Sequence, residues 1–181
     1  MAYSIEDFKS VMTRRGGLAR PNLFRVTLPP LSSTSRDLTI MCKTAQLPGR
    51  QILTNERRHG IETSRISYGY AVVEVPMTFY ETNDYNIRKY FEQWQNIAVN
   101  QETRELGYLR GSNGYGKDVV IEQLKKPTEG SANDVSEADV VYKCRLIEAF
   151  PTTLSSIDLS DAENSVVEVN VSLSYTNWYE V

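Results

Sequence analysis

The stretch VEVNVSLSYT, residues 167–176, alternates apolar and polar residues over ten positions without an error. Its odd-numbered positions hold valine, leucine or tyrosine, and its even-numbered positions hold glutamate, asparagine, serine or threonine. A period of two predicts a β-strand with one side in a core and the other in contact with water. The polar side is small, mostly neutral and free of lysine and arginine, so the strand also predicts an unusual surface.

Segments with the same alternation precede this strand and predict the rest of an antiparallel sheet of seven or eight strands. Val75, Met77 and Phe79, for example, share one side of their segment. Residues 19–31 and 36–49 flank the polar turn SSTS, and we expect them to form a hairpin. The other expected elements are strands at 71–81, 118–126 and 140–152 and a short helical turn at 154–161.

Two segments have the helical period instead. Residues 83–100 place apolar side chains three or four positions apart, which predicts an amphipathic helix that covers a sheet or the open end of a barrel. Asn83 or Asp84 is expected to cap its first turn. Residues 4–12 predict a short N-terminal helix with Ser4 as the N-cap. The apolar stripe of the longer helix consists of Ile87, Tyr90, Phe91, Trp94, Ile97 and Ala98.

These elements predict one mainly β domain over residues 1–181, an antiparallel β-sandwich or barrel with one flanking helix at about 83–100 and a short N-terminal helix. Residues 49–70 do not fit its core, because they are strand-like but polar on both sides. Two interpretations remain open for this segment. It is either a surface loop or a polar β-arm that packs on another chain.

Composition limits the classes of partner. The chain has 181 residues and a formal net charge of −3, which argues against a general nucleic-acid binder, since neutralising phosphates requires a basic face. No apolar run approaches the roughly 18 residues of a membrane span, and the N-terminus lacks the apolar core of a signal peptide. We therefore expect a protein of the cytoplasm until it is assembled or released. Cys42 and Cys144 are expected to be reduced and buried.

Motifs for catalysis are weak. Residues 111–118, GSNGYGKD, nearly match a phosphate-binding loop, but Asp118 stands where Ser or Thr should hold magnesium, and a strand is expected to follow. His59 is the single histidine, which leaves little material for a histidine metal site or a catalytic triad. The carboxylates are scattered, with no evident acid and base pair. We therefore expect no enzyme activity, no catalytic or metal residues and no cofactor.

An ordered set of segments carries a family resemblance. ARPNLFRV (19–26), CKTAQLPG (42–49), YFEQWQNIA (90–98), EAFPT (148–152) and VVEVNVSLSYTNW (166–178) occur in this order over nearly the whole chain. Together they resemble the tail tube proteins of contractile-tailed (myovirus) bacteriophages, a family similar in fold to type VI secretion tube proteins. The central loops 101–118 and 127–138 depart from the family pattern, because they are long and polar.

The resemblance implies a structural virion protein and a set of partners. Subunits of that family form stacked hexameric rings, the inner tail tube, through which phage DNA passes into the host as the sheath contracts. The implied partners are other copies of the chain, the tail sheath protein, the tape-measure protein and baseplate or terminator proteins, with no stable membrane association. The implied location is the virion tail tube, assembled in the host cytoplasm.

Three alternatives remain open. The chain could be the tube protein of a related contractile injection or secretion system, whose cargo is protein. It could be a tube-initiating baseplate protein, although such proteins tend to carry extra domains for which 181 residues leave no room. A small β-barrel enzyme or ligand-binding domain would instead require a convergent polar pocket, for which we find no pattern.

A tube must let DNA pass without holding it, and lysine and arginine would hold it. The polar side of the last strand and the similar side of residues 71–81 are therefore predicted to line the lumen, with contact to solvent or to the sheath as the alternative. Lys143 and Arg145 would be poor lumen residues. The candidate lumen residues are Glu74, Thr78, Glu168, Asn170, Ser172 and Ser174, and the candidate inter-subunit or inter-ring contacts are Arg57, Arg58, His59, Arg65, Lys143 and Arg145.

Overall fold

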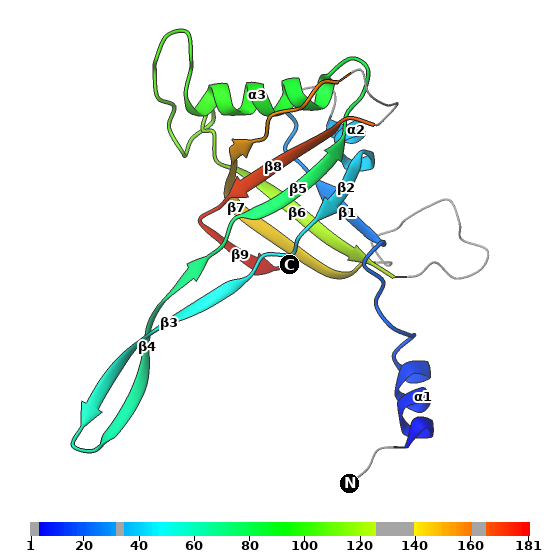
Figure 1. The fold of residues 1–181 in the computed structure, drawn as a ribbon, viewed down its shortest axis with the longest axis vertical. Helices are drawn as coiled ribbons and strands as arrows, with labels where there is room; N and C mark the ends of the chain where they lie inside the picture. Colours follow the sequence, from blue (N-terminus) through cyan, green and yellow to red (C-terminus); the bar gives the residue numbers. More distant parts are fainter. Residues whose placement is uncertain (1–3, 32–34, 126–139, 161–165) are drawn as a thin grey trace.

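The structure is a computed structural model, and it describes residues 4–31, 35–125, 140–160 and 166–181. Nine strands and three helices lie in this described part of the chain (Figure 1). In chain order they are α1 (Ile5–Arg14), β1 (Phe24–Thr27), α2 (Ser35–Ile40), β2 (Cys42–Ala45), β3 (Arg50–His59), β4 (Glu62–Val72), β5 (Val75–Tyr80), α3 (Asn86–Ala98), β6 (Lys117–Leu124), β7 (Val140–Leu154), β8 (Glu168–Ser174) and β9 (Asn177–Glu180).

One seven-stranded antiparallel sheet forms the body, in the order β1-β6-β7-β8-β5-β2, with β9 added beside β7. The long strand β7 belongs to both halves of the sheet: Val140–Ala149 pairs with β6, and Phe150–Leu154 pairs with β8. Glu148, just before the point where the pairing changes, has a left-handed backbone with φ 54°, and we call this point the bend in β7. The sheet therefore folds over itself, and the prediction of a mainly β, sandwich-like fold is confirmed.

A single core lies between the two halves of the sheet and below α3. The residues that alternate inward on β8, Val169, Val171 and Leu173, are all buried, as the opening stretch predicts. α3 lies across one end of the sheet (Figure 1) and buries Ile87, Tyr90, Phe91 and Trp94 of its predicted apolar stripe. The stripe does not extend as far as predicted, because Ile97 in the last turn is exposed and Ala98 is half-buried. The Tyr90 hydroxyl donates to the Pro29 carbonyl at 2.6 Å, so the helix is also tied to the chain after β1.

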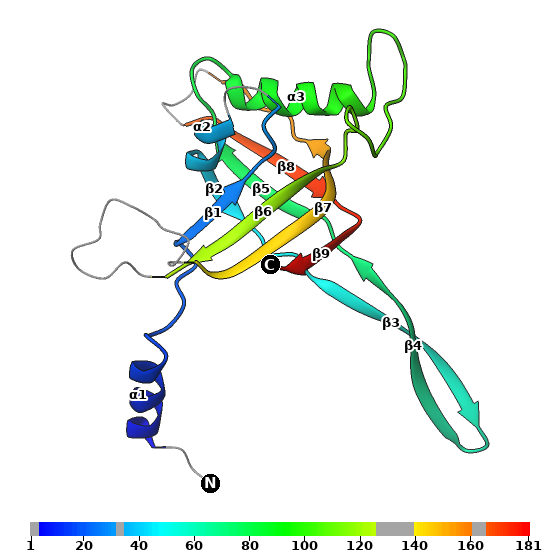
Figure 2. The same ribbon diagram turned by 180° about the vertical axis from the view of Figure 1, so that it is seen from behind.

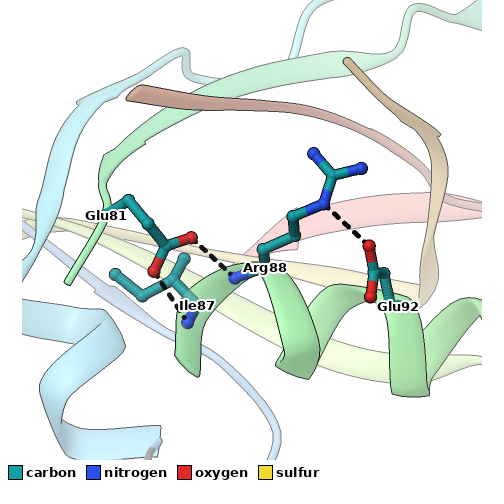
Figure 3. A network of polar contacts seen from close by, with 4 residues as sticks. All are labelled: Glu81, Ile87, Arg88 and Glu92. Carbon is teal, nitrogen blue, oxygen red and sulfur yellow. Dashed lines mark hydrogen bonds and ion pairs between the residues drawn. The ribbon is translucent and has the colours of Figure 1, made fainter. Parts of the chain in front are cut away.

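The first turn of α3 is capped by a residue that lies before the predicted helix. Tyr85 is at the N-cap position with φ 53° and makes no side-chain cap, so the prediction that Asn83 or Asp84 caps the helix is wrong. Instead the Glu81 carboxylate accepts hydrogen bonds from the backbone N–H groups of Ile87 at 3.2 Å and Arg88 at 2.9 Å (Figure 3). A carboxylate here satisfies free N–H groups and interacts favourably with the helix dipole.

The predicted hairpin of residues 19–31 with 36–49 does not form. β1 pairs with β6 and β2 pairs with β5, so the two strands stand at opposite ends of the strand order. The segment Ser35–Ile40 is the helix α2, in which Leu38 is buried while Ile40 is exposed. The helical turn expected at 154–161 is also wrong in its described part, where Leu154 ends β7 and residues 155–160 form no helix.

α1 confirms the predicted N-terminal helix. Ser4 Oγ accepts from the Asp7 N–H at 3.2 Å, and the Asp7 carboxylate accepts from the Ser4 N–H at 3.0 Å, which completes a capping box. The helix projects from the body (Figure 2), and none of its residues is buried. Among the described residues, no helix has the length and apolar character needed to cross a bilayer.

Candidate assembly surfaces

The outward side of β2, β5 and β8 forms what we call the polar face, made of Thr44, Thr78, Glu168, Asn170 and Ser172. Thr78 lies opposite both Thr44 and Asn170 in the strand register, and its hydroxyl donates to Asn170 Oδ1 at 2.8 Å. The fold thus brings together four of the six candidate lumen residues. Whether this face lines a lumen stays a prediction.

The other two candidate lumen residues lie at the margin of the polar face. Ser174 lies opposite Phe150, whose ring packs on Tyr115 with centroids 5.0 Å apart, so this end of β8 is half-buried. Glu74 lies just before β5 and accepts a hydrogen bond from the Thr152 hydroxyl at 3.1 Å. Both residues therefore contact β7 of their own chain, at the end of β8 near the bend.

Lys43 is a functional candidate that the sequence analysis missed. Its ammonium forms an ion pair with Glu168 and lies 5.4 Å from the centroid of the Tyr80 ring. The hydrogen bond to Glu168 raises the pKa of Lys43. The polar face is therefore not free of lysine, but its positive charge is paired. The alternation within 167–176 could not reveal this, because the lysine comes from β2 at a distance of 125 residues.

Lys143 and Arg145 lie on the outward side of β7, where carboxylates of β6 accompany them. Lys143 lies 3.4 Å from Glu122, which also binds Arg25 at 2.6 Å and is only 5% exposed. Arg145 Nε donates to Asp118 at 2.9 Å. Both predicted contact residues thus have partners within their own chain. Their proposed part in subunit contacts stays a prediction. Arg145 has Asp118 as its own partner, whereas Lys143 shares the single carboxylate of Glu122 with Arg25.

The arm, β3 with β4, is a two-stranded ribbon paired from Arg50 with Val72 to His59 with Glu62. It projects far from the body (Figure 1). Near its tip, Arg57 and Arg58 are exposed, and Arg65 forms an exposed ion pair with Glu56 at 3.0 Å. The description of this segment as polar on both sides is incomplete. The arm also exposes the apolar or aromatic side chains of Ile52, Ile61, Ile66, Tyr68 and Tyr70.

The connection between α3 and β6 exposes a complementary set of side chains at the other end of the molecule. Leu106 and Tyr108 are 77% and 84% exposed, and Glu102 and Glu105 are exposed beside them. Both views place this connection and the arm at opposite ends and on the same side of the molecule (Figures 1 and 2). The arm end of the subunit therefore offers arginine and isoleucine, and the other end offers glutamate, leucine and tyrosine around the exposed Arg104.

The glycine-rich segment 111–118 does not have the structure of a phosphate-binding loop. It leads into β6 rather than a helix, and Asp118 is occupied by Arg145. The Lys117 ammonium donates to the Ser112 carbonyl at 3.4 Å. Among the described residues, no three His, Cys, Asp or Glu side chains gather as a metal site would require.

Both cysteines are free thiols; Cys144 is buried as predicted, whereas Cys42 is only half-buried. Burial raises the pKa of Cys42 to about 12 and that of Cys144 to about 11. At neutral pH both therefore remain protonated and poorly nucleophilic.

Several solved structures share this fold. A chain of the sheath-tube complex of the PVC extracellular contractile injection system is 12% identical, with 99% of each chain covered and a TM-score of 0.63. A chain of the tube-terminating cap of the anti-feeding prophage is 14% identical, with 91% of each chain covered and a TM-score of 0.63. A baseplate chain of the same prophage is 14% identical, with 91% of this chain and 95% of that chain covered and a TM-score of 0.59.

The shared architecture, a folded-over sheet with one covering helix, places the chain in a class of folds found among tube, cap and baseplate chains. At identities of 12–14% this likeness concerns the fold alone. The chain belongs to the phage tail tube protein family, because the sequence model of that family matches residues 18–181. This is a family of structural proteins. A search of the curated proteins finds no match to the chain.

Proposed function

We propose that the chain is the repeating subunit of the inner tail tube of a contractile phage particle and assembles as stacked hexameric rings within the sheath. The observation that carries the proposal is the arm, a long ribbon that packs against the core of its own chain through Val72 at its root and exposes Ile52, Ile66 and Tyr70 further along. A two-stranded ribbon alone is marginally stable in water. Burial of these side chains on a neighbouring copy would stabilise it.

The neighbouring copy in this proposal is the subunit of the next ring. Arg57 and Arg58 at the arm tip would meet Glu102 and Glu105 in the connection between α3 and β6. These arginines and glutamates carry opposite charge and lie at opposite ends of one subunit, so a copy displaced along the tube axis presents one pair to the other. Burying an arginine without such a partner would cost several kcal/mol.

The polar face would line the lumen in this arrangement. Thr78, Asn170 and Ser172 carry no charge, and Glu168 is paired with Lys43. Such a wall gives DNA no run of unpaired cations, so no counterion release favours retention. DNA would then pass through the tube when the sheath contracts. The further partners in this proposal are the sheath, tape-measure, baseplate and terminator proteins, with assembly in the host cytoplasm.

Electron microscopy of the purified full chain tests the proposal. We expect hollow tubes of uniform width, and deletion of residues 54–62 should leave folded subunits or single rings that do not stack. Arg57→Glu with Arg58→Glu should have the same effect, and adding Glu102→Lys with Glu105→Lys should restore tubes. Normal tubes from the deletion variant would show that the arm is a surface loop. Rings from the wild-type chain that never elongate would favour a cap or a baseplate initiator.

A further inference from the structure

The junction between the arm and the body has few backbone connections. The arm's ladder begins at the pair of Arg50 with Val72, whereas β2 ends at Ala45 and β5 begins at Val75. Residues 46–49 and 73–74 are therefore the two covalent links, and among the described residues no strand pairing continues from the arm into the body sheet. A ribbon held only by two short links would change its direction easily.

Arg50 joins the arm to the body at this junction. Its guanidinium carbon lies 5.3 Å from the centroid of the Tyr70 ring on β4 and 4.9 Å from that of Trp178 on β9. The same group donates hydrogen bonds to the Trp178 carbonyl at 2.9 Å and to Asn177 Oδ1 at 3.2 Å. One side chain thus contacts an aromatic ring of the arm and three groups of the C-terminal strand. We call this set of contacts the Arg50 clamp.

The chemistry of the clamp requires arginine. A planar guanidinium can stack on aromatic rings while its N–H groups donate in the plane, whereas the ammonium of lysine is a compact charge without a face to stack. Among the residues that the structure describes, no carboxylate forms an ion pair with Arg50. The guanidinium of Arg50 therefore connects the rings of Tyr70 and Trp178 and does not neutralise a carboxylate.

The lever that the clamp controls is long. β3 has 10 residues, which at about 3.3 Å per residue gives an arm of about 33 Å. A rotation of about 10° at the junction would displace the tip by about 6 Å, using the same rise per residue. That displacement exceeds an ion-pair distance. A small rotation at the junction would therefore move the arm tip out of its binding site.

We propose that the Arg50 clamp fixes the direction of the arm in the free subunit and so prepares it to bind the next ring. This inference rests on the proposed function of the arm as the contact between rings. Fixing the arm before assembly means that less conformational freedom is lost on binding, which strengthens association without any new contact. Arg50 acts as a positioning residue in this proposal, because it orients the arm and does not itself bind the neighbour.

The first experiment measures the arm in the unassembled subunit. Spin labels are attached at Thr63→Cys near the arm tip and at Gln93→Cys on α3, two exposed positions, and the distance distribution is recorded by pulsed electron spin resonance. We expect a narrow distribution for the native clamp, a width at least about doubled for Arg50→Ala and an intermediate width for Arg50→Lys. Arg88→Ala removes an arginine that pairs only across the surface of α3 and should leave the distribution narrow.

The second experiment measures assembly of the unlabelled variants. Arg50→Ala should raise the concentration needed for tube growth about tenfold, equivalent to about 1.4 kcal/mol, while its thermal unfolding midpoint stays close to that of the native chain. Arg88→Ala should assemble normally. A distribution for Arg50→Ala as narrow as the native one, or unchanged assembly by this variant, would overturn the inference. If the native chain forms no tubes, the proposed function fails, and the distance measurement still decides whether the clamp orients the arm.

Discussion

Glu81→Ala should lower the stability of the fold, because it removes the cap of α3 while leaving every core side chain in place. The Glu81 carboxylate accepts hydrogen bonds from the backbone N–H groups of Ile87 at 3.2 Å and Arg88 at 2.9 Å (Figure 3), and a third from that of Thr82 at 3.0 Å. Removing it leaves the first turn of α3 without a side-chain acceptor, because Tyr85 provides no cap. Fraying of this turn would expose Ile87, which is fully buried.

The expected magnitude follows from the cost of losing a cap. Replacing a capping side chain by alanine costs about 0.5–2 kcal/mol, and three bonds to a charged acceptor place this site near the upper end, at about 2 kcal/mol. For a chain of this length, each kcal/mol lowers the unfolding midpoint by about 2–4 °C, so we expect a fall of about 4–8 °C. Glu81→Gln retains one acceptor oxygen and should lose about half as much.

Thermal unfolding at neutral pH, followed by far-ultraviolet circular dichroism, measures the effect. Glu92→Ala is the matched control, because it removes a carboxylate from the same helix whose ion pair with Arg88 is surface-exposed. Such a pair contributes only about 0.3–0.5 kcal/mol, so the midpoint should fall by no more than about 2 °C. Equal midpoints for the Glu81 and Glu92 variants would refute the assignment of Glu81 as the cap of α3.

Three further predictions concern the polar face, the bend in β7 and the thiols. Asn170→Lys with Ser172→Lys should leave tubes intact but add roughly a dozen charges to each hexameric ring and slow DNA ejection; Val169→Lys should prevent folding, and normal ejection from the double variant would refute the lumen assignment. Hydrogen bonding to Arg110 lowers the pKa of Glu148, so its stabilising effect should be present above the unfolded pKa of 4.5 and be lost as pH falls through the lower folded value. Glu148→Gln should therefore flatten the fall in stability below pH 4.5, as measured by urea unfolding at several pH values. Because burial raises the pKa of Cys144 to about 11, a thiol reagent at pH 8 should modify the folded chain far more slowly than the urea-unfolded chain, and equal rates would contradict its burial.

Local periodicity in the sequence determined which residues face the core. The odd positions Val169, Val171, Leu173 and Tyr175 are all buried, and the stripe of α3 is buried from Ile87 to Trp94. These predictions succeed because a strand or helix repeats its orientation toward a core every two or every 3.6 residues, whatever the element packs against. The arm could be recognised for the same reason, since a strand-like segment without a dry side has no place in its own core.

Only the tertiary structure decided which strands pair and which distant side chains meet. β1 joins β6 rather than β2, although the two segments are close in sequence, because pairing depends on the whole strand order. Lys43 reaches Glu168, and Arg50 reaches Trp178, across more than 120 residues of chain. No local pattern encodes such contacts, since each depends on the register of strands and the bend of β7. The polar face and the Arg50 clamp exist only once the sheet has folded over and brought β2 and β9 to the positions where these side chains meet their partners.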